Sequence, residues 1–259
     1  MFLQDSHEIT PGYAAASYSD FLSSELKNTE RIAISQSINN GKLSAIFGKD
    51  SRYSESASGW WLASEHKKFL EHVKEERSEG RHVFSLACDD DLGFGVYTLG
   101  DFGTDQGVAW DLGEPDLKEW WDNGYMITAC GARDSRFYYV MTRGAKGFER
   151  GIGQSWAKQS TWNEVKKYIS EKWKEGMIIT GICYSTGLKQ YLVIMTESSE
   201  GQDYKWESEG ISEWMDEQYE KKHHPTIIFT DPIDQDDFVV MTTDKNRSGY
   251  RKLHITLKE

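Results

Sequence analysis

The 259-residue sequence is poor in cysteine, proline, basic residues and long apolar runs, and each shortage bears on the class of protein. Its three cysteines, Cys88, Cys130 and Cys183, form neither a disulfide framework nor a CxxC pair, so we expect a reducing compartment, the cytoplasm or the nucleus. The longest apolar runs, such as 191–195, are far shorter than the ~18 residues that a transmembrane helix needs. The first residues show no basic and apolar leader, so no secretory signal is expected.

Acidic residues outnumber basic residues by 42 to 30, which gives a formal net charge of -12. A negative surface repels phosphate backbones, so we expect no nucleic-acid partner, no membrane association and a protein partner of basic character. We also expect no cofactor and no metal, because HExxH, paired CxxC and EF-hand patterns are missing. The sequence does not indicate an oligomeric state. Hydrophobic residues make up 38% and aromatic residues 13%, which is enough to build a core.

A string that contains glycine recurs along the chain. The segment 121–128, Trp-Asp-Asn-Gly-Tyr-Met-Ile-Thr, matches the segment 173–180, Trp-Lys-Glu-Gly-Met-Ile-Ile-Thr, at an offset of 52 residues. A third copy at 77–85 keeps the glycine and ends on Ser85, and weaker copies lie at 28–35 and 221–228. A fixed period of this size indicates a repeat architecture.

Two further landmarks recur in the same order. The first is a run of strand type that ends on threonine at Thr98, Thr142, Thr196 and Thr242, with the segment 46–48 as its weakest copy. The second is a tryptophan at Trp61, Trp110, Trp156 and Trp206. The most economical interpretation is that these tryptophans are core wedges between neighbouring units.

Each unit is predicted to run helix, strand, strand, strand. The helices are expected at 18–27, 65–76, 115–122, 161–174 and 209–220. Ser64 is predicted to cap the second helix, Pro115 to lie in the first turn of the third, and Thr161 with Glu164 to form a capping box on the fourth.

Glycines are predicted to end three of these helices. Gly80, Gly124 and Gly176 lie where a helix needs a left-handed terminating residue, and in the last unit Pro225 is expected to stop the helix instead. Asp-, Asn-, Gly- and Ser-rich segments at 39–41, 89–91, 133–135, 185–187 and 234–237 are predicted to be hairpin turns.

The predicted fold class is therefore an α+β repeat protein in a single domain. The units span about 17–63, 64–112, 113–158, 159–207 and 208–257, with residues 1–16 as an N-terminal tail or a latch. One such unit cannot bury its apolar face alone, so the units must pack on one another. We expect five helix-plus-three-strand units closed into a pentein-like α/β propeller. A β-propeller-like ring or an open solenoid array is the alternative.

The glycine-containing string also carries a family resemblance. Residues 121–128, with Met141, Thr142 and the pair 147–148 after them, resemble the repeat found C-terminal to the kinase domain of plant casein-kinase-I-like kinases. Residues 172–176 followed by 195–196 show the same similarity, and about 115–245 carries it. The resemblance implies a non-catalytic repeat domain. The sequence has no phosphate-binding glycine loop and no HRD catalytic loop, so it implies no kinase activity.

The cysteines are the first catalytic candidates, because a pentein-like hydrolase uses a cysteine nucleophile with a histidine. Cys183 and His254 are the weak candidates, with His223 and His82 as other possible partners. When Ser85 is matched to Thr180, Cys88 aligns with Cys183, and recurrence at equivalent positions favours packing over a unique nucleophile. His223 and His224 are interpreted as ending the fifth helix rather than as metal ligands, and the acidic turns as solvated tips.

Aromatic residues that do not repeat are the candidate binding residues. In a repeat protein the recurring positions already supply the packing, so a nonrecurring ring is expected to be exposed for recognition. These residues are Trp60, Tyr138, Tyr139, Trp162 and Tyr184. The function predicted first is a non-catalytic protein-interaction or regulatory repeat domain. A carbohydrate-binding, lectin-like protein and a pentein-like Cys hydrolase are the alternatives.

Overall fold

The computed structural model describes residues 5–7, 32–39, 42–50, 52, 58–90, 93–100, 102–146, 153–206, 211–233, 236–243 and 247–256. This part of the chain is mixed α+β, with most residues in small antiparallel sheets. The helix predicted at 18–27 lies outside the described residues. None of the described helices is long and apolar enough to cross a membrane.

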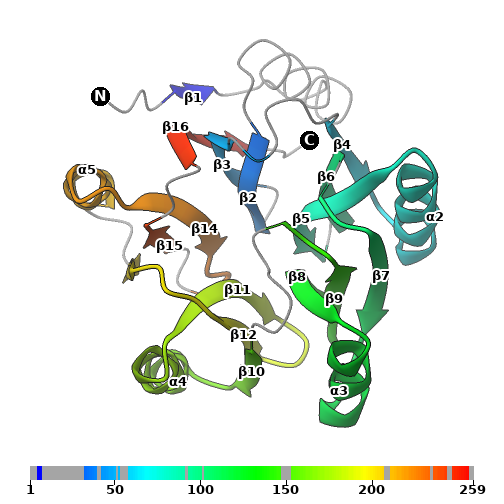
Figure 1. The fold of residues 1–259 in the computed structure, drawn as a ribbon. Coiled ribbons are helices and arrows are strands. Elements are labelled where there is room, and N and C mark those ends of the chain that lie inside the picture. The colour runs from blue at the N-terminus through cyan, green and yellow to red at the C-terminus, as the bar shows by residue number, and fades with distance from the viewer. Residues whose placement is uncertain are drawn as a thin grey trace.

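Five sheets lie around a common centre, and the helices lie at the periphery (Figure 1). The helices are α2 (His66–Ser78), α3 (Glu114–Asp122), α4 (Trp162–Lys174) and α5 (Ile211–Glu220). The inner strands are β2 (Ile32–Asn39), β5 (Arg81–Asp89), β8 (Tyr125–Arg133), β11 (Met177–Ser185) and β14 (His224–Thr230). The middle strands are β3 (Lys42–Asp50), β6 (Gly93–Gly100), β9 (Arg136–Arg143), β12 (Gln190–Glu197) and β15 (Asp237–Thr242). The outer strands are β4 (Ser58–Ala63), β7 (Asp105–Trp110), β10 (Gln154–Gln159), β13 (Gln202–Trp206) and β16 (Arg247–Thr256).

Each sheet joins residues of two consecutive sequence units. The strand orders are β4-β6-β5, β7-β9-β8, β10-β12-β11 and β13-β15-β14, and the middle strand is antiparallel to both neighbours. The outer strand therefore comes from the end of one unit, and the helix connects it to the inner strand of the next. In the first sheet the C-terminal β16 pairs with β3, and β1 (Asp5–His7) pairs with β16 in parallel. Strand pairing thus ties each unit to its neighbour.

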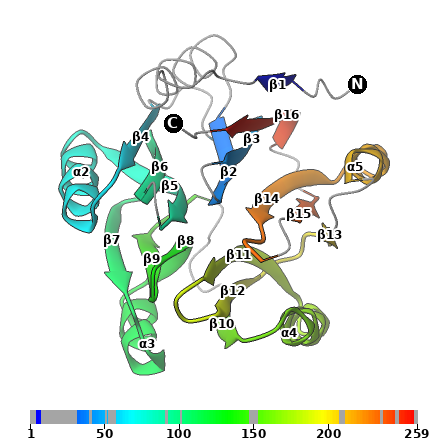
Figure 2. The ribbon, with the colours of Figure 1, turned by 180° about the vertical axis from the view of Figure 1, so that it is seen from behind.

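The inner strands contact one another in cyclic order around the centre, and the reverse view shows the same arrangement (Figure 2). β2 contacts β5, β5 contacts β8, β8 contacts β11, β11 contacts β14, and β14 contacts β2. Hydrogen bonds join the last inner strand to the first: Ser35 accepts from the backbone N–H of Ile228 at 3.0 Å, and Ser37 accepts from that of Thr230 at 3.0 Å. Serines on β2 therefore satisfy the backbone of β14.

Local sequence signals explain most helix ends. Pro115 lies in the first turn of α3, and Thr161 and Glu164 form the capping box of α4, as predicted. The cap predicted at Ser64 is wrong: Glu65 is the N-cap of α2 and makes no side-chain cap hydrogen bond. The Ser64 carbonyl accepts a hydrogen bond from Arg133 instead.

The left-handed residue after each helix recurs in all four described units. Gly80, Gly124 and Gly176 have φ of 77°, 80° and 81°, which confirms the prediction. In the last unit the prediction is incomplete, because Lys222 adopts φ 63° before the proline is reached. The N–H of Lys222 donates to the carbonyl of Tyr219, the same three-residue step that Gly176 makes to Trp173. A lysine therefore holds the conformation that glycine holds elsewhere.

The helices α2, α3 and α4 each pack between their own sheet and the next sheet. One core cluster joins Phe69 of α2 and Phe94 of β6 to Tyr138 of β9. The Phe69 and Phe94 rings stack at 4.4 Å, and the Tyr138 ring meets Phe94 edge-on at 4.9 Å. The clusters around α3 and α4 have the same composition, with β11–β12 and β14–β15 as the next sheet. Burial of the side chains in these clusters couples each of these three sheets to the one that follows.

A β-bulge interrupts the inner strand of every sheet. The register against the middle strand shifts between Ala33 and Ser35, Val83 and Ser85, Ile127 and Ala129, Ile179 and Gly181, and Pro225 and Ile227. The bulge residues are therefore Ile34, Phe84, Thr128, Thr180 and Thr226. The last four each lie four residues after the left-handed residue of their unit. Phe84, and not Ser85, is the equivalent of Thr180, so the predicted alignment of the second unit is off by one residue.

A glutamine on the next sheet binds the backbone beside three of these bulges. The Gln106 amide accepts from the N–H of Val83 and donates to the carbonyl of Val83, both at 2.8 Å. It also donates to the Thr142 hydroxyl at 2.8 Å. Gln154 makes these three contacts with Ile127 and Thr196, and Gln202 makes them with Ile179 and Thr242. We call this set of contacts the glutamine clasp.

The clasp explains two of the sequence landmarks. Thr128, the bulge residue, shares a hydrogen bond with Thr142 at 2.7 Å, and the Thr180–Thr196 and Thr226–Thr242 pairs repeat it. The threonine after isoleucine and the threonine that ends the middle strand therefore meet at the clasp. Thr98 differs, because its hydroxyl donates to Glu76.

We predict that Gly176→Val lowers the free energy of unfolding by about 1–2 kcal/mol, because valine is strained at positive φ. No heavy atom lies within 4 Å of the Cβ position at Gly176, so backbone strain is the main cost. Lys222→Gly should have the opposite sign and stabilise by up to about 1 kcal/mol. Urea unfolding of both variants tests this, and an unchanged midpoint for Gly176→Val would contradict it.

We predict that Gln106→Ala lowers the free energy of unfolding by about 2–4 kcal/mol, because it leaves the buried peptide groups of Val83 without partners. Gln159→Ala is the matched control, since Gln159 is a half-buried outer-strand glutamine for which no clasp contact is found. It should change stability by no more than about 0.5 kcal/mol. Equal losses in the two variants, measured by denaturant unfolding, would show that the clasp contributes nothing specific.

Candidate functional site

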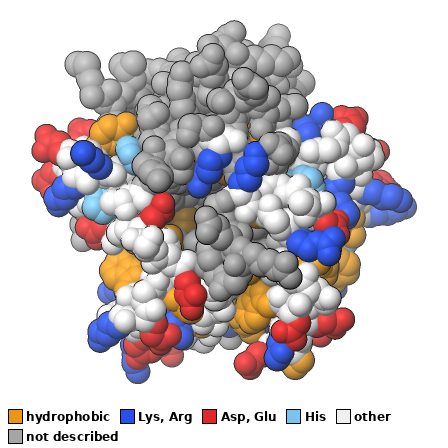
Figure 3. Space-filling view, viewed as in Figure 1, with side chains coloured by type: hydrophobic (Ala, Val, Ile, Leu, Met, Phe, Trp, Pro, Cys, Tyr) orange, Lys and Arg blue, Asp and Glu red, His pale blue; other side chains and the backbone are white. Residues whose placement is uncertain are grey.

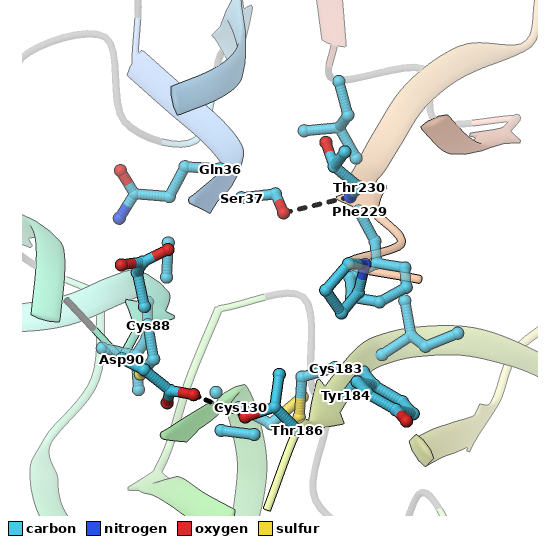
Figure 4. A pocket seen from close by; sticks show the side chains of 18 residues that line it. Gln36, Ser37, Cys88, Asp90, Cys130, Cys183, Tyr184, Thr186, Phe229 and Thr230 are labelled. Atoms are coloured by element: carbon cyan, nitrogen blue, oxygen red, sulfur yellow. Dashed lines mark hydrogen bonds between the residues drawn. The ribbon is translucent and has the colours of Figure 1, made fainter. Parts of the chain in front are cut away.

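A cavity of about 340 Å³ lies at the centre of the molecule, and all five inner strands line it (Figure 4). The lining residues come from the ends of these strands and the turns that follow: 36–37, 86–90, 130–132, 182–184, 186, 228–230 and 232. The inner strands therefore point their carboxyl ends to one end of the molecule. We call this end, with the turns between inner and middle strands, the tip face.

Free strand edges form much of the cavity wall. β5, β8 and β11 are the last strands of their sheets, and no described strand pairs with their outer edges. An edge strand presents backbone N–H and C=O groups to whatever lies beside it. On β2, Gln36 reaches across and donates to the carbonyls of Ser85 and Gly95, at 3.1 and 2.8 Å. The cavity wall is thus polar through its backbone as well as its side chains.

Hydrogen bonds join the turns around the cavity mouth. The Asp90 carboxylate accepts from the backbone N–H of Asp134 and from the Thr186 hydroxyl, both at 2.5 Å. The Asp134 carbonyl accepts from the Ser185 hydroxyl at 2.7 Å and from the N–H of Gly187 at 3.0 Å. Three successive turns are therefore held in fixed relative positions.

The side chains that line the cavity carry negative charge. Asp89 and Asp90 are its acidic lining residues, and the described lining contains no lysine, arginine or histidine. The remaining lining side chains are apolar, hydroxyl, amide or thiol groups. The cavity therefore favours a cationic or hydrogen-bonding group over an anion.

The three cysteines meet in this cavity, but they are not repeat equivalents. Cys130, Cys183 and Cys88 lie two, three and four residues after the bulge residues Thr128, Thr180 and Phe84, so the predicted equivalence of Cys88 and Cys183 is wrong. The prediction failed because the bulge position cannot be read from the sequence.

Packing accounts for each thiol. A Cβ at Gly131 would lie 2.4 Å from the Cys88 sulfur, and one at Gly181 would lie 3.1 Å from the Cys130 sulfur. The sulfurs of Cys88 and Cys130 therefore occupy space that a glycine leaves on the adjacent inner strand, and Cys183 packs in the cluster around α3. Burial raises the pKa of the Cys88 thiol well above its ordinary value, with a further contribution from Cys130. Burial likewise raises the pKa of Cys183, followed by its hydrogen bond with Cys130.

Among the residues that the structure describes, the lining of the cavity contains no histidine or lysine that could act as a base for these thiols. His82 lies at the start of β5, far along the strand from Cys88, and burial lowers its pKa. His223 lies at the end of α5 and does not line the cavity. His254 belongs to β16, and its side chain lies outside the described residues. A neutral thiol without a neighbouring base is a poor nucleophile.

The predicted binding aromatics occupy different environments. Tyr138 and Tyr139 are buried, with exposures of 4% and 0%, so the expectation that they are exposed is wrong. The Trp162 ring stacks on Trp206 at 3.7 Å, and Tyr184 lines the central cavity beside Tyr191. The side chain of Trp60 lies outside the described residues. The middle strand β9 is covered on both faces, so nonrecurrence of Tyr138 and Tyr139 did not mean exposure.

The recurring tryptophans do not occupy one position. Trp61 packs on Phe69 and His72 of α2, the helix of its own sheet. Trp110 and Trp206 pack on α2 and α4, the helices of the preceding sheets, through His66 and Trp162. Trp156 lies beside the cluster around α3. Trp110 is 39% exposed, so it is not enclosed by its neighbours.

Two features of the described part of the chain bear on a metal site and on kinase activity: the grouping of possible metal ligands, and a tripeptide that resembles a kinase motif. No group of three His, Cys, Asp or Glu side chains there could hold a metal ion. The tripeptide 101–103 has the letters DFG of kinases, but the Phe102 side chain is buried against Phe84. A Cβ at Gly103 would lie 2.4 Å from Thr142. Phe102 and Gly103 therefore serve packing.

Several residues of the site have a sequence signal that the repeat landmarks did not capture. Gln106, Gln154 and Gln202 recur at steps of 48 residues, and this regular step identifies them. Leu188 and Ile233 are apolar residues inside polar turns, and they are 40% and 59% exposed. With Trp110, they are the exposed large hydrophobic residues of the described chain.

Searches of protein-family models and of curated proteins find no match for this chain.

We predict that Cys88, Cys130 and Cys183 react with iodoacetamide at pH 7.4 at least tenfold more slowly than free cysteine. The raised pKa of Cys88 and Cys183 keeps these two thiols protonated, whereas an ordinary cysteine has a pKa of about 8.5. The side chain of Cys130 is buried, which restricts access of the reagent. The rate should rise when the protein is unfolded in urea at the same pH. A single cysteine that reacts as fast as free cysteine in the folded protein would support the hydrolase alternative.

Proposed function

We propose that this chain is a non-catalytic protein-interaction domain whose tip face receives a basic segment of a partner protein. The observation that carries the proposal is the position of Trp110, Leu188 and Ile233. Leu188 and Ile233 lie in the turns after β11 and β14, and Trp110 ends β7, opposite Tyr138 at the start of β9. All three therefore lie at the tip face, Leu188 and Ile233 in turns that follow inner strands and Trp110 at the end of an outer strand.

Exposed apolar side chains grouped on one face are typical of binding surfaces. Core positions elsewhere in the repeats are filled, since the middle strands β6, β9, β12 and β15 are almost wholly buried. Of the exposed residues, Leu188 and Ile233 lie in turns, where no packing requirement explains a leucine or an isoleucine, and Trp110 is the last residue of β7. Binding of a partner would bury these exposed side chains.

The charge at the tip face favours a basic partner. The acidic residues described at this end are Asp89, Asp90, Asp111, Asp134, Asp231, Asp236 and Asp237. The basic ones in and beside the turns are Arg133, Arg136 and Lys189, and Lys67 and Lys68 lie at the start of α2 at the same end. On the side turned to the viewer in Figure 3, in contrast, acidic and basic side chains alternate around the periphery. A partner with lysines or arginines gains steering and complementarity at the acidic end.

The proposal includes the architecture predicted from the repeats. We infer that the five sheets form one closed ring of the pentein-like α/β propeller type, supported by the cyclic contacts of the inner strands and by the pairing of β16 with β3. The resemblance of 121–128 to the repeat of plant casein-kinase-I-like kinases supports a non-catalytic role. In this view the ring is a rigid support for the turns.

The alternatives have less support. A lectin-like protein needs exposed ring faces, and Trp110 and Tyr184 are the described aromatics best placed to supply them. A pentein-like hydrolase needs an activated thiol, and the described cavity gives Cys88 and Cys183 raised pKa values and no basic neighbour. Neither nucleic acid nor membrane fits the acidic tips.

We predict that Ile233→Lys reduces binding of the partner at least tenfold, because it removes an apolar contact and adds repulsion toward a basic segment. Asn123→Lys is the control, because it adds the same charge at the end of α3, on the face opposite to the tip face. Partners are first isolated from the native cell by crosslinking to the wild-type protein. Their dissociation constants are then measured with the wild type and with each variant. Equal binding by Ile233→Lys and wild type would refute the tip face as the interface.

A further inference from the structure

A second cavity, of about 360 Å³, lies at the tip face between the start of α2 and the β8–β9 turn. His66, Arg133, Arg136 and Tyr138 line it, together with two aspartates and Ser135. It is separate from the central cavity, with which it shares no lining residue. Unlike the central cavity, it presents arginines.

Arg133 is fixed in place by the neighbouring sheet. Its guanidinium donates to the carbonyls of Ser64 and Asp90, at 2.9 and 3.2 Å, and lies 5.4 Å from the centre of the Phe94 ring. The Nε of Arg133 and the Nδ1 of His66 are nevertheless buried without a hydrogen-bond partner. A buried N–H group without an acceptor is unfavourable, so an oxygen-bearing ligand would satisfy a need that the protein leaves open.

The aspartates of this cavity do not make close hydrogen bonds with the arginines. Asp134 lies 3.9 Å from Nε of Arg133, and Asp111 lies 3.5 Å from Nε of Arg136. Both distances exceed the ~2.7–2.9 Å of a charged hydrogen bond. The aspartate side chains are 74% and 47% exposed and are free to turn toward water.

The local potential at His66 is positive. Burial lowers the pKa of His66, and Arg136 and Arg133 lower it further. The adjacent helix end adds to this, because α2 has Lys67 and Lys68 in its first turn and no side-chain cap. α3 and α4 instead place Asp116 and Glu164 against their own N-termini. At α2 the Glu65 carboxylate makes no cap hydrogen bond and lies 3.2 Å from Nζ of Lys68.

Two aromatic rings flank His66 at this cavity. Tyr138 lines the cavity, and its ring lies 5.6 Å from the His66 ring. Trp110 is not a lining residue, but its ring is 39% exposed and meets the His66 ring edge-on at 4.7 Å. A partly exposed indole next to the cavity provides a surface for a flat group. The cavity is also larger than a single oxyanion requires.

We propose that this cavity binds an oxyanion carried on a planar ring, an aromatic carboxylate or an aryl phosphate. The anion lies against Arg136 and Nε of Arg133, and the ring lies against Trp110. Guanidinium groups bind both oxyanions through the same fork geometry, so one site serves either compound.

The test follows the indole N–H signal of Trp110 in ¹H–¹⁵N NMR spectra of the full chain, assigned with Trp110→Phe. Benzoate, phenyl phosphate, inorganic phosphate and phenol are titrated separately. We expect a saturable shift with benzoate or phenyl phosphate, and the tighter of the two identifies the class. Inorganic phosphate and phenol should bind at least tenfold more weakly than that ligand.

Arg136→Gln should weaken the better ligand at least tenfold. Arg136 is 54% exposed, so the variant is expected to fold, and the dispersion of the spectrum checks this. Arg143→Gln, 51% exposed and at the far end of β9, is the matched control and should bind as wild type does. Equal binding of phenol, equal binding of inorganic phosphate, an unaffected Arg136→Gln, or no saturable shift at all would each overturn the proposal. None of these outcomes depends on a protein partner.

Discussion

The structure depends on hydrogen bonding of the peptide groups that the β-bulges leave unpaired. At three of the bulges the next repeat supplies the hydrogen-bond partner. A bulge in every inner strand leaves peptide groups that the middle strand cannot pair, and a buried unpaired peptide group is costly. At three of the bulges a glutamine from the following sheet binds both the N–H and the C=O of the residue before the bulge. The units are therefore joined by specific hydrogen bonds as well as by apolar packing.

The glutamine clasp does not involve the carboxyl ends of the inner strands, which line the central cavity instead. Beyond the bulge, the edges of β5, β8 and β11 face the central cavity, and the turns that follow are linked through Asp90 and Asp134. Rigid elements thus carry short turns whose side chains can vary without disturbing the clasp. This separation of scaffold from turns is what makes the tip face suited to recognition.

Local chemistry made much of the fold predictable. The helix ends at Gly124 and Gly176 and the capping box of Thr161 and Glu164 follow from interactions within a few residues, so a sequence pattern suffices. Lys222 was missed because the left-handed conformation there is imposed by the chain on both sides rather than by glycine. The candidate site was less predictable, because Tyr138 and Tyr139 look alike in sequence to Tyr184, and only the covering sheets distinguish a buried ring from one that faces a cavity.

By itself, the sequence determined the repeated order of helix and strands, the positions of the turns and the negative charge. These depend on periodicity, on backbone preferences and on composition, which act over short distances. Only the tertiary structure decided that the third strand of each unit joins the next sheet, and that three cysteines from different positions meet at one cavity. Such contacts join residues about 50 positions apart, and they arise from which surfaces and unpaired peptide groups the whole molecule can satisfy at once.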